Sequence, residues 1–193
     1  MDAAIRIREA EARDAATIAA VYAPYVRDTV ISFETEPPTA EDMSRRLAAI
    51  GARYPWLVAE QGGQVLGYAY AGEHRSRAAY RWDVDVAVYL AAAAHRRGIG
   101  RRLYGALFEV LRQLGHINAY AGIALPNAAS VSLHQALGFA PVGVYRKVGY
   151  KHGAWHDVGW WALVLQPPPS TPAEPIPYPM LDHASLRALL ETA

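Results

Sequence analysis

Cysteine is absent from the 193 residues of the sequence, and its absence excludes several kinds of chemistry. Without thiols the chain forms no disulfide, holds no thiolate-bound metal and carries no acyl group on a cysteine during a reaction. Long apolar runs are missing too, because none approaches the roughly 18 residues that a membrane-spanning helix needs. The chain starts with MDAAIR, which has no basic stretch followed by an apolar one, so we expect no signal peptide, a cytoplasmic location and no membrane partner.

An excess of charge of either sign is also missing. The chain has 19 lysines and arginines and 18 aspartates and glutamates, and its net charge of +1 gives no support to a nucleic-acid partner. Hydrophobic residues make up 52% of the chain, enough for one domain with a sizeable core. We expect that domain at residues 1–166, because a run rich in proline begins at Pro167. Residues 167–193 are expected to form a Pro-rich linker and a short C-terminal tail that docks loosely or stays disordered.

Hydrophobic periodicity predicts alternating strands and helices. Strands are indicated at residues 5–8, 56–60, 65–70, 82–90, 117–123, 139–145 and 156–165. Helices are predicted after Asp14 as N-cap, after a capping box of Thr39 and Asp42, after Gly100, and after Asn127. This order is typical of an α/β fold in which helices flank a mixed sheet.

The strongest functional signal is the segment HRRGIGR, residues 95–101, between a strand and a helix. Unpaired backbone N–H groups and the helix dipole form an anion site there, well suited to a pyrophosphate. Gly98 and Gly100 let the backbone around Ile99 approach a ligand without an intervening Cβ. Positive charge is added by arginines of the same segment, namely Arg96, Arg97 and Arg101. The segment therefore predicts a site for a phosphorylated carrier.

Two common carrier motifs do not match these residues. A dinucleotide fingerprint needs a third glycine where Leu103 stands, and a P-loop needs Gly-Lys-Ser/Thr. The segment instead resembles the acyl-coenzyme A loop of the GNAT superfamily, Gln/Arg-x-x-Gly-x-Gly/Ala, with His95 at its first position.

Four further segments resemble the phosphinothricin and methionine sulfoximine N-acetyltransferases within that superfamily. They are SFETEPPT (32–39), AYAG with RAAY (69–72 and 77–80), LPNAASVSLHQALGF (125–139) and GYKHGAWHDVG (149–159). The resemblance covers residues 5–165 and implies a GNAT-type mixed, strongly bent sheet flanked by helices. It also implies an acetyl-CoA-dependent N-acetyltransferase that needs no metal. The protein is further expected to form a homodimer, with the second helix and the final strands as candidate contacts.

The resemblance assigns residues to the acetyl-CoA site. The backbone groups of Val88, Tyr89 and Leu90 are expected to hold the pantetheine arm, on a strand that parts from its neighbour. Further contacts are implied at the glycine loop and at the start of the helix that follows Asn127. The residues are Arg96, Arg97, Gly98, Ile99, Gly100, Arg101, Asn127 and Ser130. Asn127 has a plainer interpretation as the N-cap of its helix.

Two candidate catalytic residues follow from the same comparison. An amine is mostly protonated at neutral pH, so a base or a water relay is useful. The family's glutamate falls at Asp85, which acts directly, acts through water, or is an ordinary salt-bridged carboxylate, with Asp83 as its local competitor. His134 falls where the superfamily commonly has a tyrosine near the departing sulfur, and it is either a proton donor to the thiolate or a structural histidine.

Substrate choice is expected to depend on Phe33, Arg75, Arg77, Tyr80 and Asp85. Guanidinium groups pair well with carboxylate, phosphinate or sulfoximine-like oxygens, which suits a small amino-acid analogue acetylated at its α-amino group. Direct transfer is expected, since no cysteine carries the acetyl group. The alternatives are another amine (a protein N-terminus or a polyamine) and a non-catalytic acyl-CoA-binding sensor. His152, His156 and Asp157 flank a turn rather than a helix, which argues against a metal site.

Overall fold

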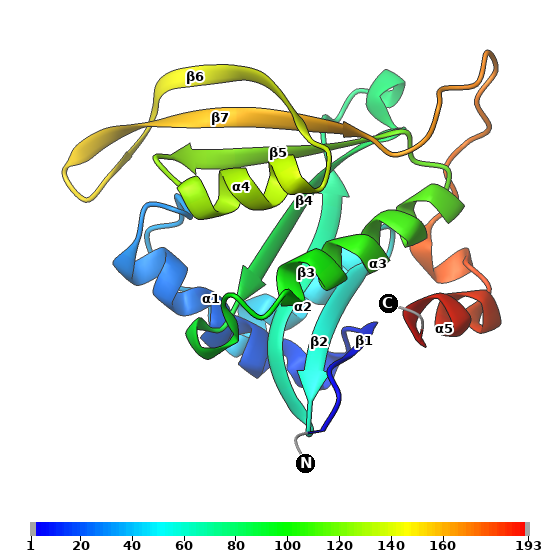
Figure 1. Ribbon diagram of the computed structural model, residues 1–193, viewed down its shortest axis with the longest axis horizontal. Coiled ribbons are helices and arrows are strands. Elements are labelled where there is room, and N and C mark those ends of the chain that lie inside the picture. Colours follow the sequence, from blue (N-terminus) through cyan, green and yellow to red (C-terminus); the bar gives the residue numbers. More distant parts are fainter. Residues whose placement is uncertain (1–2, 192–193) are drawn as a thin grey trace.

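A seven-stranded sheet in the order β1-β2-β3-β4-β5-β7-β6 forms the centre of the molecule. The structure, a computed structural model, describes residues 3–191 (Figure 1). The strands are β1 (Arg6–Glu9), β2 (Trp56–Gln61), β3 (Gln64–Glu73), β4 (Asp83–Leu90), β5 (Asn118–Leu125), β6 (Ala140–Lys151) and β7 (Ala154–Val164). All seven predicted strands are confirmed, and β6 runs six residues further than expected because its end pairs with the start of β7.

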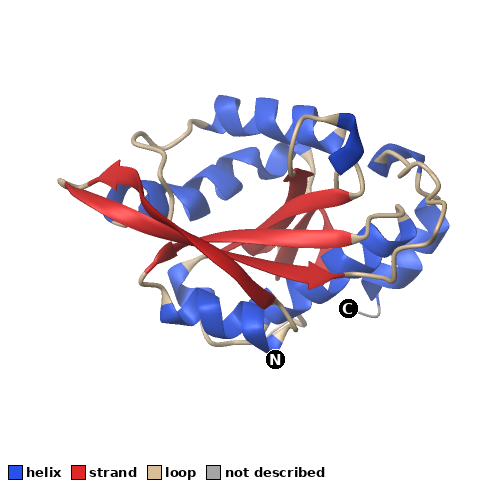
Figure 2. Cartoon of the chain, turned by 90° about the horizontal axis from the view of Figure 1, so that it is seen from above, coloured by secondary structure: helices blue, strands red, loops and turns tan. Residues whose placement is uncertain are grey.

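Helices cover both faces of the sheet (Figure 2). The α-helices are α1 (Ala15–Asp28), α2 (Ala40–Gly51), α3 (Ile99–Gln113), α4 (Ala128–Ala136) and α5 (His183–Glu191), and the short 3-10 turns are η1 (Ala12–Asp14), η2 (Ala78–Tyr80), η3 (Ala92–Ala94) and η4 (Tyr178–Met180). Successive side chains of strand β4 point to opposite faces of the sheet, so the strand contributes to two core clusters. Val84 and Val86 are buried in the cluster on the α3 side, whereas Tyr89 packs against the cluster on the α1 side.

The sheet is bent where β4 and β5 separate. These parallel strands pair only from Asp83 to Asp85, opposite Asn118 to Tyr120, while β5 pairs with β7 along its whole length. Beyond Asp85 the two strands diverge, and Figure 1 shows β5, β6 and β7 running across the direction of β2, β3 and β4. The predicted mixed, strongly bent sheet is therefore confirmed.

Local capping signals explain where several helices begin. Thr39 Oγ1 accepts a hydrogen bond from the N–H of Asp42 at 3.1 Å, and Asp42 Oδ2 accepts one from the N–H of Thr39 at 2.9 Å, so the predicted capping box is confirmed. Asn127 Oδ1 accepts from the N–H of Ser130 at 3.1 Å and caps α4. Asp14 differs from the prediction, because its carboxylate makes no cap bond to α1.

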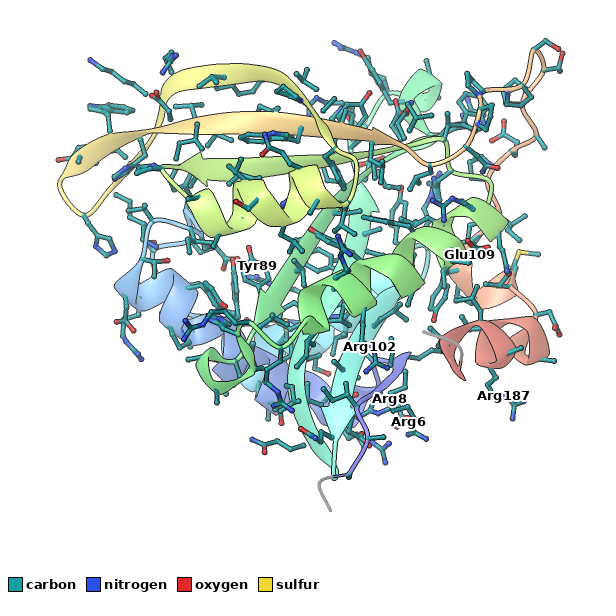
Figure 3. The ribbon with its side chains drawn as sticks, viewed as in Figure 1. Arg6, Arg8, Tyr89, Arg102, Glu109 and Arg187 are labelled. Atoms are coloured by element: carbon teal, nitrogen blue, oxygen red, sulfur yellow. The ribbon has the colours of Figure 1, made fainter. Side chains whose placement is uncertain are left out.

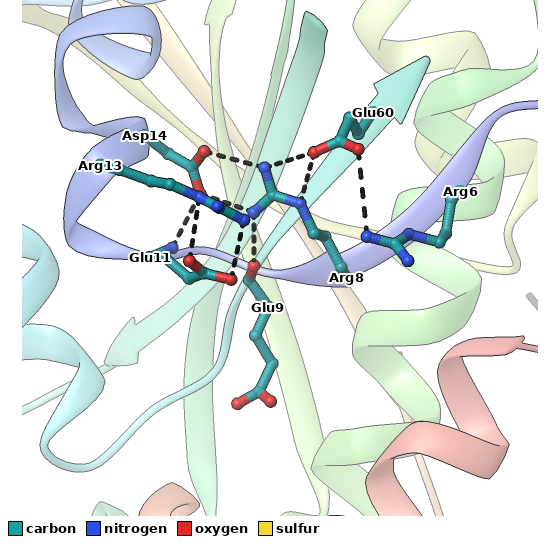
Figure 4. A network of polar contacts seen from close by, with 7 residues as sticks. All are labelled: Arg6, Arg8, Glu9, Glu11, Arg13, Asp14 and Glu60. Atoms are coloured by element: carbon teal, nitrogen blue, oxygen red, sulfur yellow. Dashed lines mark hydrogen bonds and ion pairs between the residues drawn. The ribbon is translucent and has the colours of Figure 1, made fainter. Parts of the chain in front are cut away.

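Asp14 instead belongs to an ion network centred on Arg8 (Figure 4). The guanidinium donates to both Asp14 oxygens at 2.7 and 2.9 Å and to Glu60 on β2 at 2.7 Å. Burial opposes ionisation of Asp14, but the hydrogen bonds from Arg8 and from the N–H of Glu11 lower the pKa of its carboxyl below the ordinary 3.8. The network joins β1, η1 and β2 and lines a cavity in which charges of both signs are already paired.

The C-terminal segment packs more closely than expected. Leu181, Leu186 and Leu190 are buried in the core cluster on the α3 side, and α5 contacts β1 and α3 (Figure 1). The Pro-rich segment is held on the way there, since Trp82 Nε1 donates to the carbonyl of Ala173 at 2.8 Å. The expectation of a loose or disordered tail is therefore wrong for the described residues, because apolar side chains beyond the prolines complete a core. Within residues 3–191 we find no helix both long and apolar enough to span a membrane.

Candidate functional site

The opening between β4 and β5 exposes part of the backbone of β4. Backbone groups alternate between the two neighbours along a strand, so Val88 and Leu90 direct theirs toward the open side and Tyr89 directs its own toward Tyr68 on β3. At Leu90 the open side is already used, because the Tyr25 hydroxyl donates to the Leu90 carbonyl at 2.6 Å. The prediction that all three residues offer free backbone groups is therefore wrong for Tyr89 and Leu90, and Val88 keeps the expected geometry.

The side chain of Tyr89 points from β4 into an aromatic group beside this opening (Figure 3). Its ring centroid lies 4.8 Å from that of Tyr22 and 5.1 Å from that of Tyr25, both on α1 and both edge-on. Edge-to-face contacts of this kind stabilise a fixed ring orientation. The group therefore keeps α1 against the end of β4, next to the glycine turn.

The glycine turn has the geometry that the anion site needs. Gly98 has φ +75°, in the left-handed region, and precedes the first residue of α3. The first bond within the helix runs from the N–H of Arg102 to the carbonyl of Gly98, so the N–H groups of Ile99, Gly100 and Arg101 have no acceptor in the helix. A Cβ on Gly100 would lie 3.3 Å from Leu133, which shows how closely α3 begins beside α4.

The arginines of the turn are exposed, and their contacts differ. Arg97 donates to the side-chain oxygen of Gln61 at 2.7 Å, and Arg101 donates to the carbonyl of Ala136 at the end of α4 at 3.1 Å. Arg96 has φ +60°, an unusual backbone conformation for a residue with a side chain. Neither Arg97 nor Arg101 is paired with a carboxylate in these contacts, so their positive charges remain uncompensated near the start of α3.

His134 lies in the interior rather than in the group around Asp85. It is 3% exposed, with Nδ1 at 2.8 Å from the carbonyl of Ser130 and Nε2 at 3.1 Å from the Tyr104 hydroxyl. Burial lowers the pKa of the imidazole, which favours the neutral ring. Both nitrogens are thus occupied within the fold, and these contacts fit the structural interpretation of His134 better than that of a proton donor.

Asp85 lies at the point where the strands part, and it has a histidine partner. Its Oδ1 is 2.6 Å from Nδ1 of His74, the residue that follows β3. Burial raises the pKa of the Asp85 carboxyl above its ordinary value, although the hydrogen bond from His74 opposes that shift. Its competitor Asp83 has a different partner, since Oδ1 accepts from the Asn118 side chain at 2.9 Å.

Aromatic rings fix the position of His74. Its imidazole stacks on Tyr120 of β5, with ring centroids 4.2 Å apart and planes 14° apart. Tyr80 and Trp160 approach edge-on, each with its centroid at 6.3 Å. The structure thereby brings the predicted residues Asp85 and Tyr80 together with three residues that the sequence reasoning missed, namely His74, Tyr120 and Trp160.

Trp160 also lines an apolar cavity of about 350 Å³. Its lining comes from the loop after α1 and from the last three strands, and consists of Ile31, Phe33, Gly122, Ala124, Tyr145, Val148, Val158 and Trp160. Phe33 packs directly on β6, because a Cβ at Gly149 would lie 2.2 Å from its ring. The predicted substrate residue Phe33 is therefore a wall of this cavity.

A buried polar network holds the loop that carries Phe33. Lys151 is 6% exposed and donates through Nζ to the carbonyls of Val26 and Ser32. Glu34 accepts two hydrogen bonds from Arg46 on α2, at 2.7 and 2.8 Å, and these bonds lower the pKa of its carboxyl despite burial. The loop is thus tied to α1, α2 and β6.

The two predicted substrate arginines line the same polar cavity. The Arg75 guanidinium also lies 5.7 Å from the centre of the Trp160 ring, and one of its nitrogens donates to the carbonyl of His74. The polar cavity has a volume of about 360 Å³ and is lined by Arg53, Tyr54, Glu73, Arg75, Ser76, Arg77, Ala78, Tyr80, Arg81 and Glu174. Arg81 forms an ion pair with Glu174, so the Pro-rich segment closes one side of this second cavity.

His156 and Asp157 of the β6–β7 hairpin each have a hydrogen-bond partner within the fold. Nε2 of His156 lies 3.0 Å from the carbonyl oxygen of Lys151, and the Asp157 carboxylate accepts a hydrogen bond from Arg146 at 2.7 Å. In the part of the chain that the structure describes, no three His, Cys, Asp or Glu residues gather as a metal site would require.

Comparisons with known proteins agree with this geometry. The family model described as an acetyltransferase (GNAT) domain matches residues 7–160. A phosphinothricin N-acetyltransferase of Streptomyces viridochromogenes is 41% identical over 173 residues, which cover 89% of this chain and 94% of the relative. An L-methionine sulfoximine/L-methionine sulfone acetyltransferase of Salmonella typhimurium is 37% identical, over 82% of this chain and 94% of the relative.

A solved structure extends the likeness to three dimensions. The phosphinothricin acetyltransferase of Sinorhizobium meliloti, in complex with AcCoA, superposes with a TM-score of 0.84 at 35% identity. The match covers 90% of this chain and 98% of that one.

Proposed function

Because this chain belongs to the GNAT family of N-acetyltransferases, we propose that it transfers the acetyl group of acetyl-CoA directly to the α-amino group of a small amino-acid analogue. Phosphinothricin, methionine sulfoximine and methionine sulfone are the analogues that the names of its relatives suggest. The observation that carries the proposal is the position of Asp85. This residue lies where β4 and β5 separate, between the open backbone of β4 and the loop that carries Arg75.

The residues present fit acetyl-CoA. The unpaired N–H groups of Ile99, Gly100 and Arg101 suit its pyrophosphate, and the charges of Arg96 and Arg97 increase the attraction. The open side of Val88 suits the amide groups of the pantetheine arm, which pair with a strand as another strand would. A main-chain N–H there also suits the thioester carbonyl oxygen, where negative charge develops.

The residues around Asp85 fit an amino-acid analogue. We propose that its carboxylate pairs with Arg75 and Arg77, which line one polar cavity, and Arg75 also lies over the ring of Trp160, a residue of the apolar cavity. Its side chain then enters the cavity beside Phe33 and Trp160, and its amino group is left near Asp85. A polyamine lacks the carboxylate and would place a second positive charge against these arginines.

The chain is also proposed to be a homodimer. Strand β6 forms one edge of the sheet, and a sheet edge is usually protected or paired. Tyr150 and Trp155 lie together near the tip of the β6–β7 hairpin, with ring centroids 5.3 Å apart and exposed fractions of 61% and 60%. Exposed aromatic residues of this kind are typical of interface cores.

The experiment is to measure thiol release from acetyl-CoA with phosphinothricin, methionine sulfoximine, methionine sulfone and a polyamine. We expect release with the amino-acid analogues and a loss of about 10²-fold or more in kcat in Asp85→Ala, since that is the usual scale for removing a group that assists proton transfer. Asp83→Ala is the matched control on the same strand, because Asp83 pairs with Asn118 and not with His74.

Each outcome is decisive for the proposal. Release that is lost in Asp85→Ala and kept in Asp83→Ala supports it. Release with the polyamine alone overturns the substrate class. Tight binding of acetyl-CoA without release in the presence of any amine overturns transfer and leaves an acyl-CoA-binding protein.

A further inference from the structure

His74 is a buried titratable residue beside the reacting position that the proposed function has not used. Its side chain is 11% exposed, between the end of β3 and the start of the loop that carries Arg75. The Tyr120 ring supports one face of the imidazole at 4.2 Å, and Asp85 holds Nδ1 at 2.6 Å. A ring held by both stacking and a hydrogen bond has a fixed orientation, as a catalytic group requires.

The hydrogen bond to Asp85 also determines which ring nitrogen is basic. An ionised carboxylate has no proton to give, so Nδ1 of His74 carries the hydrogen and donates it. The neutral ring then has its lone pair at Nε2. Among residues 3–191 we find no hydrogen bond to Nε2 of His74, and that atom is available to a substrate.

We propose that Nε2 of His74 accepts the proton of the acceptor's ammonium group, and that Asp85 is a positioning residue that keeps His74 in the required tautomer. This inference rests on the proposed function, because it assumes an amine bound beside the split of β4 and β5. It assigns the base to a residue that the sequence analysis did not select.

Two neighbours of His74 belong to the proposed substrate site. Trp160, which lines the apolar cavity, and Tyr80, on the loop with Arg75, both approach the ring edge-on. Asp85 is the last residue of β4 that pairs with β5, so the ring lies at the start of the opening. The cavity, the arginine-bearing loop and the opening thus meet at His74.

The ammonium nitrogen of the acceptor must lose one proton before it can attack the thioester carbonyl carbon. The ammonium gives a proton to Nε2, and the freed nitrogen lone pair forms a C–N bond to the thioester carbonyl carbon as the C–S bond breaks. The second surplus proton of the nitrogen leaves with the sulfur, so that CoA departs as the thiol, and the imidazolium releases its proton to solvent.

The first test compares kinetic constants with a chemical rescue. His74→Phe keeps an aromatic ring to stack on Tyr120 and removes both nitrogens, so we expect kcat to fall by about 10²- to 10⁴-fold while acetyl-CoA affinity stays unchanged. In His74→Ala, added imidazole should restore part of kcat, which a purely structural histidine would not allow. The double variant His74→Phe/Asp85→Asn should be no slower than the slower single variant, because the two residues act as a unit.

The second test observes the pair without turnover. Nitrogen-15 NMR of histidine-labelled protein, assigned with His74→Phe, should show the Nδ1–H tautomer of His74 in the native protein and lose that preference in Asp85→Asn. An Nε2–H tautomer in the native protein overturns the inference.

The outcomes separate the two proposals. If His74→Phe keeps kcat within threefold while Asp85→Ala loses it, the carboxylate acts directly and only the inference fails. If the native protein releases no thiol with any amine, the proposed function fails, and the inference fails with it.

Discussion

Gly149 shows how a single residue sets the shape of the apolar cavity, which is the proposed acceptor cavity. Its missing side chain makes room for the Phe33 ring, which a Cβ would approach to 2.2 Å. Crowding of that kind moves the ring, because carbon atoms do not approach so closely. The wall of the cavity is thus a contact between the loop after α1 and strand β6.

We predict that Gly149→Ala raises KM for the amino-acid acceptor by about tenfold, or ~1.4 kcal/mol, and leaves KM for acetyl-CoA unchanged. Displacement of Phe33 changes the acceptor cavity and leaves the glycine turn untouched. Steady-state kinetics with each substrate varied measures this. Gly143→Ala on the same strand is the control, since its Cβ would have no neighbour within 4 Å. Equal effects of the two variants would contradict the prediction.

At the scale of elements, the Arg8 network joins pieces that are distant in sequence. Arg8 and Asp14 are 12% and 6% exposed, and the pair connects β1 to the turn before α1. Removing one partner of a buried pair leaves a charge without compensation. This network therefore contributes to the position of α1, whose tyrosines lie against the end of β4.

Asp14→Asn is predicted to lower the free energy of unfolding at pH 7 by about 3 kcal/mol. The folded-state pKa of Asp14 is lowered, so its contribution is complete above the unfolded value of 3.8 and is lost as pH falls through the lower folded value. The native protein and Asp14→Asn should therefore converge below pH 3.8 in urea unfolding. Asp28→Asn, in an exposed pair with Arg27, should match the native protein at pH 7. A constant difference between the native protein and Asp14→Asn at all pH values would contradict this account.

For the whole molecule, the proposed homodimer is predicted to depend on the tip of the β6–β7 hairpin. Trp155→Glu places a charge in the proposed contact, and we predict that it converts the dimer into a monomer in sedimentation velocity. Val164→Glu is the control, because Val164 is equally exposed at the other end of β7, at 62% against 60%. A monomeric native protein, or a dimer that survives Trp155→Glu, would overturn the proposed homodimer.

The sequence by itself determined the local features, which depend on residues that are close together along the chain. The capping box of Thr39 and Asp42 and the start of a helix beside Gly98 and Gly100 followed from local spacing, because each involves only a few consecutive residues. The family resemblance added the bent sheet and the position of Asp85.

Only the tertiary structure decided how distant segments meet. His74 and Asp85 are paired because the register of β3 and β4 brings Gly72 opposite Asp85, and Tyr120 reaches the same point through the short β4–β5 contact. Two other contacts also join segments that are distant in sequence. The Tyr25 hydroxyl donates to the Leu90 carbonyl, and Leu186, which follows the Pro-rich segment, packs into the core. Such contacts depend on strand register and on helix packing, which no local pattern specifies.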